Sequence, residues 1–194
     1  MKFSFSTLAC PDYTWADIYS MAKDLGFDGI EVRGLGNDIF DASKNMPFSP
    51  RLLPATKQKL RALRLTIPCL SSGCCLRDGA TVETVAEVRA YIEAAESIGT
   101  PYVRVLGDLN PAPDGDVDDE AVLAALRALL PYAEEKGVTL LVETNGVYSD
   151  TARLRALLDR APSDNVGALW DVHHPYRFAG ESPEKTVQNL GMYI

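Results

Sequence analysis

Short apolar segments alternate with amphipathic stretches six times along this chain, at a spacing of roughly 30 residues. The apolar segments predict strands at 2–9, 27–34, 66–73, 101–108, 138–146 and 165–174. The amphipathic stretches predict helices at 14–25, 51–64, 81–98, 118–136, 150–160 and 183–190. The chain therefore reads as an α/β protein built from six βα units.

The predicted strands are nearly continuous apolar runs, which is typical of parallel strands covered on both faces. An open doubly wound sheet and a (β/α)₈ barrel both fit this pattern. The first βα turn reads LACPDYTW and lacks the glycines of a dinucleotide-binding turn. Polar residues follow the ends of successive strands, and in a barrel those ends converge on one rim. We therefore expect the (β/α)₈ TIM barrel.

Six units leave this barrel two strands short of eight. We expect a single domain over residues 1–194, apparently truncated after about six βα units, with strands seven and eight missing. Such a piece has two unpaired sheet edges, which a partner chain can cover. A homo-oligomer, or a non-catalytic barrel fragment that needs a partner, is therefore an open alternative.

Composition narrows the possible partners. The chain has 194 residues and a formal net charge of −8, without a cluster of lysine or arginine, which disfavours nucleic-acid binding. Its four cysteines form no C-x-x-C pair and its N-terminus does not resemble a signal peptide, so a reduced, cytoplasmic protein is expected. No stretch of roughly 20 apolar residues predicts a membrane span.

Two acids close apolar strands at the end where a barrel opens. Glu143 ends LLVE, Asp171 ends GALWD, and His174 follows three residues later. Carboxylate oxygens suit Mg²⁺ or Mn²⁺, and an added imidazole admits Zn²⁺, Co²⁺ or Mn²⁺. We expect Glu143 and Asp171 to bind a divalent metal. Each acid has the alternative role of a helix N-cap or a salt-bridge partner.

Other polar residues have two readings each. Arg104 lies between valines, where it can bind a substrate oxygen or form a buried ion pair with a carboxylate such as Glu143. Glu31 shares this ambiguity. His174 is the better histidine for a substrate contact or proton transfer, whereas His173 is expected to be a loop residue.

Four motifs together resemble the xylose-isomerase-like TIM barrels: F-D-G-I-E-V-R, V-R-V-L-G, L-V-E-T-N-G and W-D-V-H-H-P. That group includes sugar phosphate isomerases and epimerases, inosose dehydratases and AP endonucleases. The resemblance implies that Glu143 and Asp171 are two of four metal ligands. The other two would be a histidine after strand seven and a glutamate after strand eight, both beyond this sequence. It also places His174 beside the substrate and Glu31 on the rim.

Two departures narrow the function that the resemblance implies. The third and fourth strand ends read CLSSG and RVLGD and lack the endonuclease histidines, which disfavours DNA repair. Ser149 stands where ketose 3-epimerases have a second glutamate. We expect a metal-dependent isomerase or epimerase that acts on a small ketose, polyol or sugar phosphate through an enediolate. Glu143 and His174 would be catalytic, and Glu31, Arg104 and His174 would contact this carbohydrate. An inosose-type dehydratase is the alternative.

Overall fold

The computed structural model describes residues 1–35, 38–39, 46–161 and 163–194. Its contacts divide the chain into two compact units, Met1–Ser72 with Tyr91–Val103 and Gly73–Ala90 with Arg104–Ile194. We call them the first and the second unit, and each is described by itself. The single domain over 1–194 stays a prediction.

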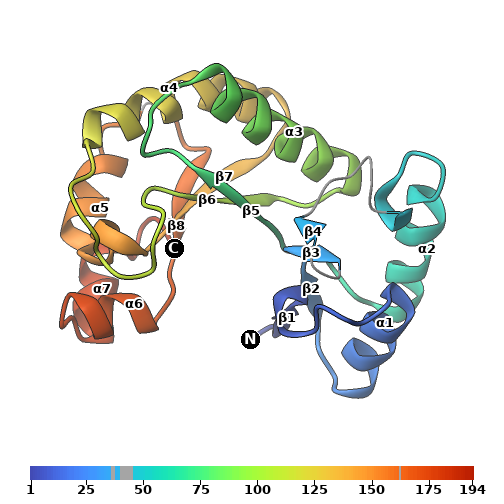
Figure 1. Ribbon diagram of the computed structural model, residues 1–194. Helices are drawn as coiled ribbons and strands as arrows, with labels where there is room; N and C mark the ends of the chain where they lie inside the picture. Colours follow the sequence, from blue (N-terminus) through green and yellow to red (C-terminus); the bar gives the residue numbers. More distant parts are fainter. Residues whose placement is uncertain (36–37, 40–45, 162) are drawn as a thin grey trace. The chain divides into compact units, whose positions relative to one another are not determined.

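The described elements alternate between strands and helices along the chain (Figure 1). The strands are β1 (Ser4–Ser6), β2 (Gly29–Glu31), β3 (Gly34–Leu35), β4 (Asp38–Ile39), β5 (Cys69–Cys75), β6 (Tyr102–Leu106), β7 (Thr139–Glu143) and β8 (Val166–Leu169). The α-helices are α1 (Trp15–Asp24), α2 (Leu53–Leu63), α3 (Val82–Ile98), α4 (Asp119–Glu135), α5 (Thr151–Leu158), α6 (His173–Phe178) and α7 (Pro183–Leu190). Short 3₁₀ turns lie at Thr7–Ala9, Met46–Phe48 and Gly146–Ser149.

The strands pair mainly in chain order. In the first unit, β1 runs parallel to β2, and an isolated parallel bridge joins Val32 to Leu70 at the start of β5. A four-stranded sheet has the order β5-β6-β7-β8, and β7 runs parallel to β8. The predicted α/β class with parallel strands is confirmed. The antiparallel pair β3–β4 was not predicted.

Helix α1 shows how local sequence sets an element's boundary. The Thr14 hydroxyl accepts the N–H of Asp17, and the Asp17 carboxylate accepts the N–H of Thr14. This capping box satisfies N–H groups that the first helical turn leaves unpaired. The predicted helix start at Thr14 therefore coincides with the observed N-cap.

Most observed strands are shorter than predicted, and for two of them the structure shows why. The first ends at Ser6, because Cys10 N–H donates to the carbonyl of Thr7 and closes a 3₁₀ turn. The last was predicted to run through residue 174, but it ends at Leu169 and α6 begins at His173. His173 N–H donates to the side chain of Asp171, so the chain turns directly after the strand.

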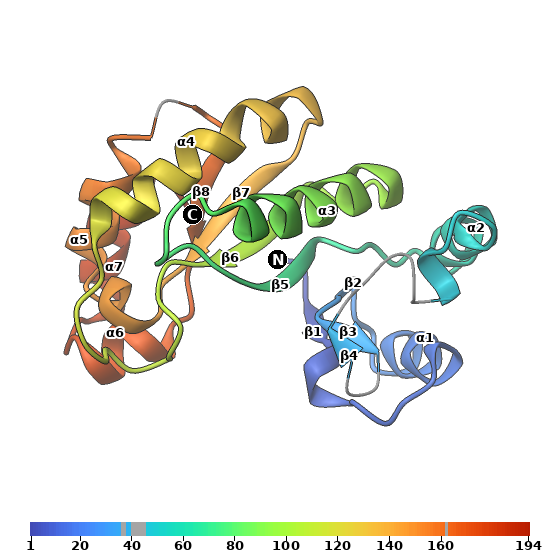
Figure 2. The same cartoon turned by 45° about the horizontal axis from the view of Figure 1, so that its top comes forward.

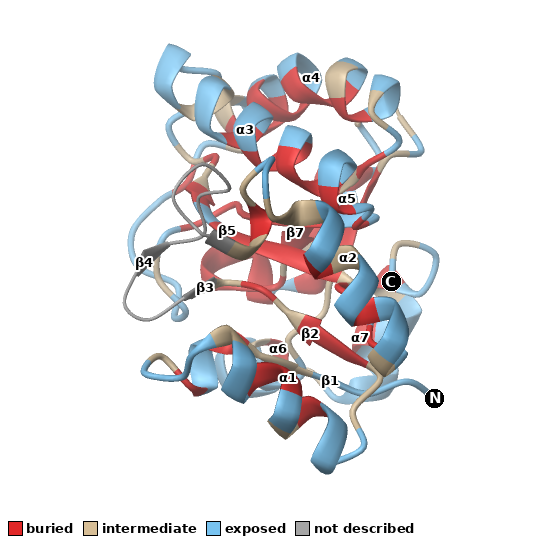
Figure 3. Ribbon diagram, turned by 90° about the vertical axis from the view of Figure 1, so that its right-hand side faces the viewer, coloured by how far each residue is buried: buried red, intermediate tan, exposed pale blue. Residues whose placement is uncertain are grey.

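The core of the second unit lies between the strands and the inner faces of its helices. Helix α4 contacts β7, and one side of the helix is buried (Figures 2 and 3). Its buried residues include Leu123, Leu126 and Leu130, at helical spacing. Each fully buried leucine contributes about 1.5–3 kcal/mol to folding. Helix α4 thus packs against β7, the strand that ends at Glu143.

Two further expectations concern the cellular compartment and membrane spans. The reduced, cytoplasmic compartment stays a prediction. Cys10, Cys69, Cys74 and Cys75 are all free thiols. Among the described residues, no helix combines the length and apolar character that crossing a bilayer requires.

Candidate metal centre

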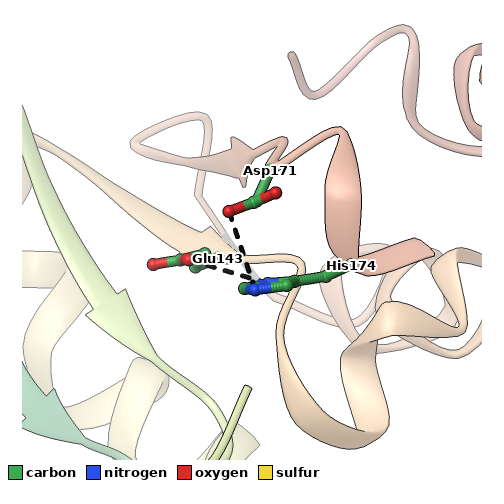
Figure 4. Close-up of side chains that lie close together, drawn as sticks. All are labelled: Glu143, Asp171 and His174. Atoms are coloured by element: carbon green, nitrogen blue, oxygen red, sulfur yellow. Dashed lines mark ion pairs between the residues drawn. The ribbon is translucent and has the colours of Figure 1, made fainter. Parts of the chain in front are cut away.

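Glu143, Asp171 and His174 lie together in the second unit (Figure 4). Each offers one ligand atom, and the three atoms lie within 4.8 Å of one another. The two acids and the histidine that the sequence singled out are thus brought into one cluster. Because no other group of this kind is found in the described parts of the chain, it is the candidate metal centre.

Parallel pairing explains how residues 28 positions apart meet. In the β7–β8 ladder Glu143 is opposite Leu169, and Asp171 lies two residues beyond. Parallel strands end at one edge of the sheet, so both carboxylates emerge there. Helix α6 then returns the chain over this edge and presents His174 from its first turn.

The imidazole of His174 faces both carboxylates. Its Nδ1 lies 3.9 Å from Oε1 of Glu143, and its Nε2 lies 3.7 Å from Oδ2 of Asp171. Both separations exceed hydrogen-bonding distance. Within the described residues, Nδ1 is buried and has no hydrogen-bond partner. A buried nitrogen without a partner is costly unless something else occupies the space it faces.

The donor set fits a divalent cation. Each of the three side chains offers one ligand atom, and these atoms lie within 4.8 Å of one another, close to the separation of about 3–4 Å between two ligand atoms of one ion. Two carboxylates with one imidazole suit Mn²⁺, Zn²⁺ or Co²⁺, and the carboxylates also suit Mg²⁺. Glu143 and Asp171 are the residues that would hold the ion, and His174 lies within reach of anything they hold.

Arg104 pairs with the other oxygen of Glu143. Its Nε lies 3.1 Å from Oε2, and the two side chains are 5% and 15% exposed. The ion pair that the sequence left as one alternative is therefore present. It holds the carboxylate so that Oε1 faces His174. A direct contact of Arg104 with substrate stays a prediction.

Glu31 belongs to the first unit, where it ends β2 and accepts a hydrogen bond from the hydroxyl of Ser71. Its predicted role at the rim stays a prediction. His173 is exposed, and its ring lies 6.0 Å from that of His174 and 6.3 Å from that of Phe178. Its main-chain N–H donates to the carboxylate of Asp171, whereas the ion pairs of the cluster are made by the ring of His174.

Asp108 organises the loops beside the cluster, a role that strand-end position alone did not reveal. It is completely buried, and its carboxylate accepts the N–H groups of Leu109 and Val147. Gly146 packs against it with φ +55°, and a Cβ at Gly146 would collide with the Asp108 side chain. The loop that follows β7 is thereby joined to the loop that follows β6.

Thr144 is a second residue that sequence reasoning missed. It follows Glu143 directly, is completely buried, and exchanges hydrogen bonds with the main chain of Asp171. A polar residue just after an apolar strand was the available signal. Ser149 is also buried, and its hydroxyl donates to the carbonyl of Gly146. This position therefore offers no carboxylate.

Comparisons with known proteins agree with this architecture. A family model described as "Xylose isomerase-like TIM barrel" matches residues 20–193. A search of curated proteins finds no match.

Three solved structures illustrate the likeness. The probable 3-DHS dehydratase AsbF from Bacillus anthracis is 20% identical, with a TM-score of 0.79 over 100% of this chain and 71% of that chain. A D-psicose 3-epimerase determined in the presence of D-fructose is 15% identical, with a TM-score of 0.75, and the match covers 97% of this chain and 69% of that chain. The IOLI protein with a bound zinc atom is 15% identical, with a TM-score of 0.72, and the match covers 100% of this chain and 70% of that chain. Such likenesses show a shared fold, and these shares fit six of a barrel's eight βα units.

Proposed function

This chain belongs to the xylose isomerase-like TIM barrel family, and from that premise we propose that it serves a metal-dependent isomerase or epimerase of small carbohydrates. The observation that carries the proposal is the cluster of Glu143, Asp171 and His174 at the carboxyl ends of β7 and β8. In barrels of this kind the reaction takes place at that end of the strands. The neighbouring folds include an epimerase and a dehydratase, which supports an enzyme in general.

The proposed substrate has a carbonyl beside a hydroxyl-bearing carbon, as in a small ketose, a polyol-derived ketone or a sugar phosphate. A divalent ion, when bound, polarises the carbonyl and acidifies the adjacent C–H. Glu143 and Asp171 hold the ion through their charges. The proton leaves carbon for a carboxylate, for which Glu143 is the proposed base, and the electron pair becomes that of an enediolate.

His174 is proposed to donate an N–H to the substrate oxygen that becomes negative in the enediolate. Its side chain is 13% exposed, so this donor acts where water is largely excluded. Return of the proton to the opposite face of the same carbon gives an epimer, whereas return to the neighbouring carbon gives an isomer. Arg104 keeps the Glu143 carboxylate in place through its 3.1 Å ion pair.

A dehydratase is the second candidate, and one observation favours it. A two-carboxylate scheme removes a proton on one face and returns one on the other, and it requires a second acid near the first. Ser149, at the position expected for that acid, directs its hydroxyl to a backbone carbonyl instead. A dehydratase needs one base to remove the proton and a donor such as His174 to protonate the leaving hydroxyl, which departs as water.

Metal binding tests the proposal most directly. Mn²⁺ affinity would be measured by electron paramagnetic resonance for the wild-type chain and for Glu143→Gln and Asp171→Asn. Each variant is expected to bind Mn²⁺ at least about 100-fold more weakly. Loss of a metal ligand weakens binding more than the about 10–100-fold that is typical when a hydrogen-bonding partner of a ligand is lost. Matched controls are Glu134→Gln and Asp164→Asn, which change exposed acids elsewhere in the second unit. Equal affinity in all five proteins would contradict the proposed site.

Product analysis separates the two candidate reactions. Ketoses incubated with the protein and Mn²⁺ in D₂O would be followed by proton NMR. An isomerase or epimerase exchanges a carbon-bound proton for deuterium, whereas a dehydratase releases water and forms a new carbonyl compound. A protein that binds no metal and catalyses neither reaction would instead support the non-catalytic barrel module. A homo-oligomer and the absence of nucleic-acid binding stay predictions of the sequence.

A further inference from the structure

Thr144 has an unusual set of hydrogen bonds at the end of β7. Its N–H donates to the carbonyl of Leu169 at 3.0 Å, which continues the ladder between β7 and β8. In a regular parallel ladder, the next bond would run from the N–H of Asp171 to the carbonyl of Thr144. Instead, Asp171 N–H donates to the side-chain hydroxyl of Thr144 at 2.9 Å. The hydroxyl therefore takes the place of a main-chain carbonyl.

The same hydroxyl also donates to the carbonyl of Asp171 at 3.2 Å. Both main-chain polar groups of Asp171 are thus held by one buried side chain. Asp171 lies between the end of β8 at Leu169 and the start of α6 at His173, so regular secondary structure does not position it. Thr144 supplies the missing constraint, and it is bonded covalently to Glu143.

The side chain of Asp171 is then oriented from its other end. Its Oδ1 accepts the N–H of His173 at 2.8 Å, and its Oδ2 lies 3.7 Å from Nε2 of His174. One oxygen is held by the main chain, and the other faces the cluster. The direction of this carboxylate therefore depends on where the main chain of Asp171 lies.

From this geometry we infer that Thr144 is a positioning residue, whose hydroxyl holds the main chain of Asp171 so that its carboxylate faces Glu143 and His174. The inference rests on the proposed metal site and deepens it. It makes Thr144, the residue after Glu143, responsible for the spacing between the two acids that would hold the ion. A hydroxyl is required for this role, and the shape of the side chain is not sufficient.

Thr144→Val is the decisive variant, because valine has the same shape and strand preference but lacks the hydroxyl. Mn²⁺ binding is expected to weaken about tenfold or more, as is typical when a partner of a metal ligand is removed. The amide hydrogen of Asp171 is expected to exchange with solvent about tenfold faster once its acceptor is lost. Thr144→Ser retains the hydroxyl and should recover both properties.

Thr186→Val is the matched control. Thr186 is also buried in the second unit, and its hydroxyl donates to Glu181 at 3.1 Å, away from the cluster. This variant loses a buried hydroxyl and some stability, yet it should keep wild-type Mn²⁺ affinity and Asp171 exchange. A purely structural role for Thr144 would give the same result for both valine variants, and that result would overturn the inference.

The two readouts separate this inference from the proposed function. If the wild-type chain binds no Mn²⁺, the metal proposal fails, and Asp171 exchange alone decides the role of Thr144. Faster exchange in Thr144→Val, restored by serine, would still support positioning. If the wild type binds Mn²⁺ and Glu143→Gln weakens it, but Thr144→Val leaves affinity and exchange unchanged, the metal site stands and the role of Thr144 is refuted.

Discussion

Removal of the Arg104 guanidinium is expected to destabilise the protein by about 3 kcal/mol, because it leaves Glu143 partly buried without this partner. The two charges are 3.1 Å apart, which at an effective dielectric constant of about 20 corresponds to an attraction of about 5 kcal/mol. Loss of one member of a buried pair typically costs about 3–5 kcal/mol. Because the Glu143 side chain is 15% exposed, water screens part of the charge, and the lower end of the range applies.

The variant would be Arg104→Met, which replaces the buried charge on β6 with an unbranched apolar side chain. Urea unfolding followed by circular dichroism gives the free energy of unfolding by linear extrapolation. The double variant Arg104→Met with Glu143→Met is expected to recover most of the loss, because it leaves neither charge unpaired. Arg160→Met is the control, since its pair with Glu120 has side chains 45% and 64% exposed and is worth less than about 1 kcal/mol.

Two results would refute this reasoning about Arg104. The first is an Arg104→Met protein within about 1 kcal/mol of the wild type, which would mean that the pair behaves as a solvated surface bridge. The second is a double variant whose loss of unfolding free energy equals the sum of the losses in the two single variants. Losses at independent sites add, whereas losses at two interacting charges do not.

Three smaller predictions concern other groups. Hydrogen bonds, first from Tyr193 and then from Arg155, hold the pKa of Asp159 below its usual 3.8. The stability that these bonds contribute is present above the unfolded pKa and is lost as pH falls through the folded pKa. Asp159→Asn should therefore lose less stability than the wild type in urea unfolding between about pH 5 and pH 3, and equal losses would contradict this. Burial raises the pKa of the Cys75 thiol, so its peptide should react with iodoacetamide at pH 8 more slowly than a free cysteine, as mass spectrometry would show. Thr14→Ala removes the α1 cap and should lower the free energy of unfolding by about 1 kcal/mol, whereas an unchanged urea midpoint would argue against the cap.

The positions of the site acids were predictable because they depend on local pattern. An acid that closes an apolar strand is expected at the carboxyl end of a parallel sheet, and Glu143 lies there. The start of α1 after Thr14 and the end of α3 at Ile98 were also predictable, since caps and stop signals act within a few residues. The proposed substrate and the proposed metal are not determined by these local signals.

Long-range contacts explain most of what the sequence did not reveal. The hydroxyl of Thr144 acts on Asp171, 27 residues away, so its role appears only when the strand register is known. The early end of β8 has a local signal in Asp171, whose side chain caps His173, but the apolar run through Trp170 and Val172 outweighed it. The burial of Asp108 likewise depends on the loop that follows β7.

The division of the chain into two units has a consequence for the cluster. Glu143, Asp171, His174, Arg104 and Thr144 all belong to the second unit. The contacts that arrange these side chains are therefore made within one unit, and the spacing of the two acids follows from the register of β7 and β8. Local opening of that strand pair is the event that would separate the two carboxylates.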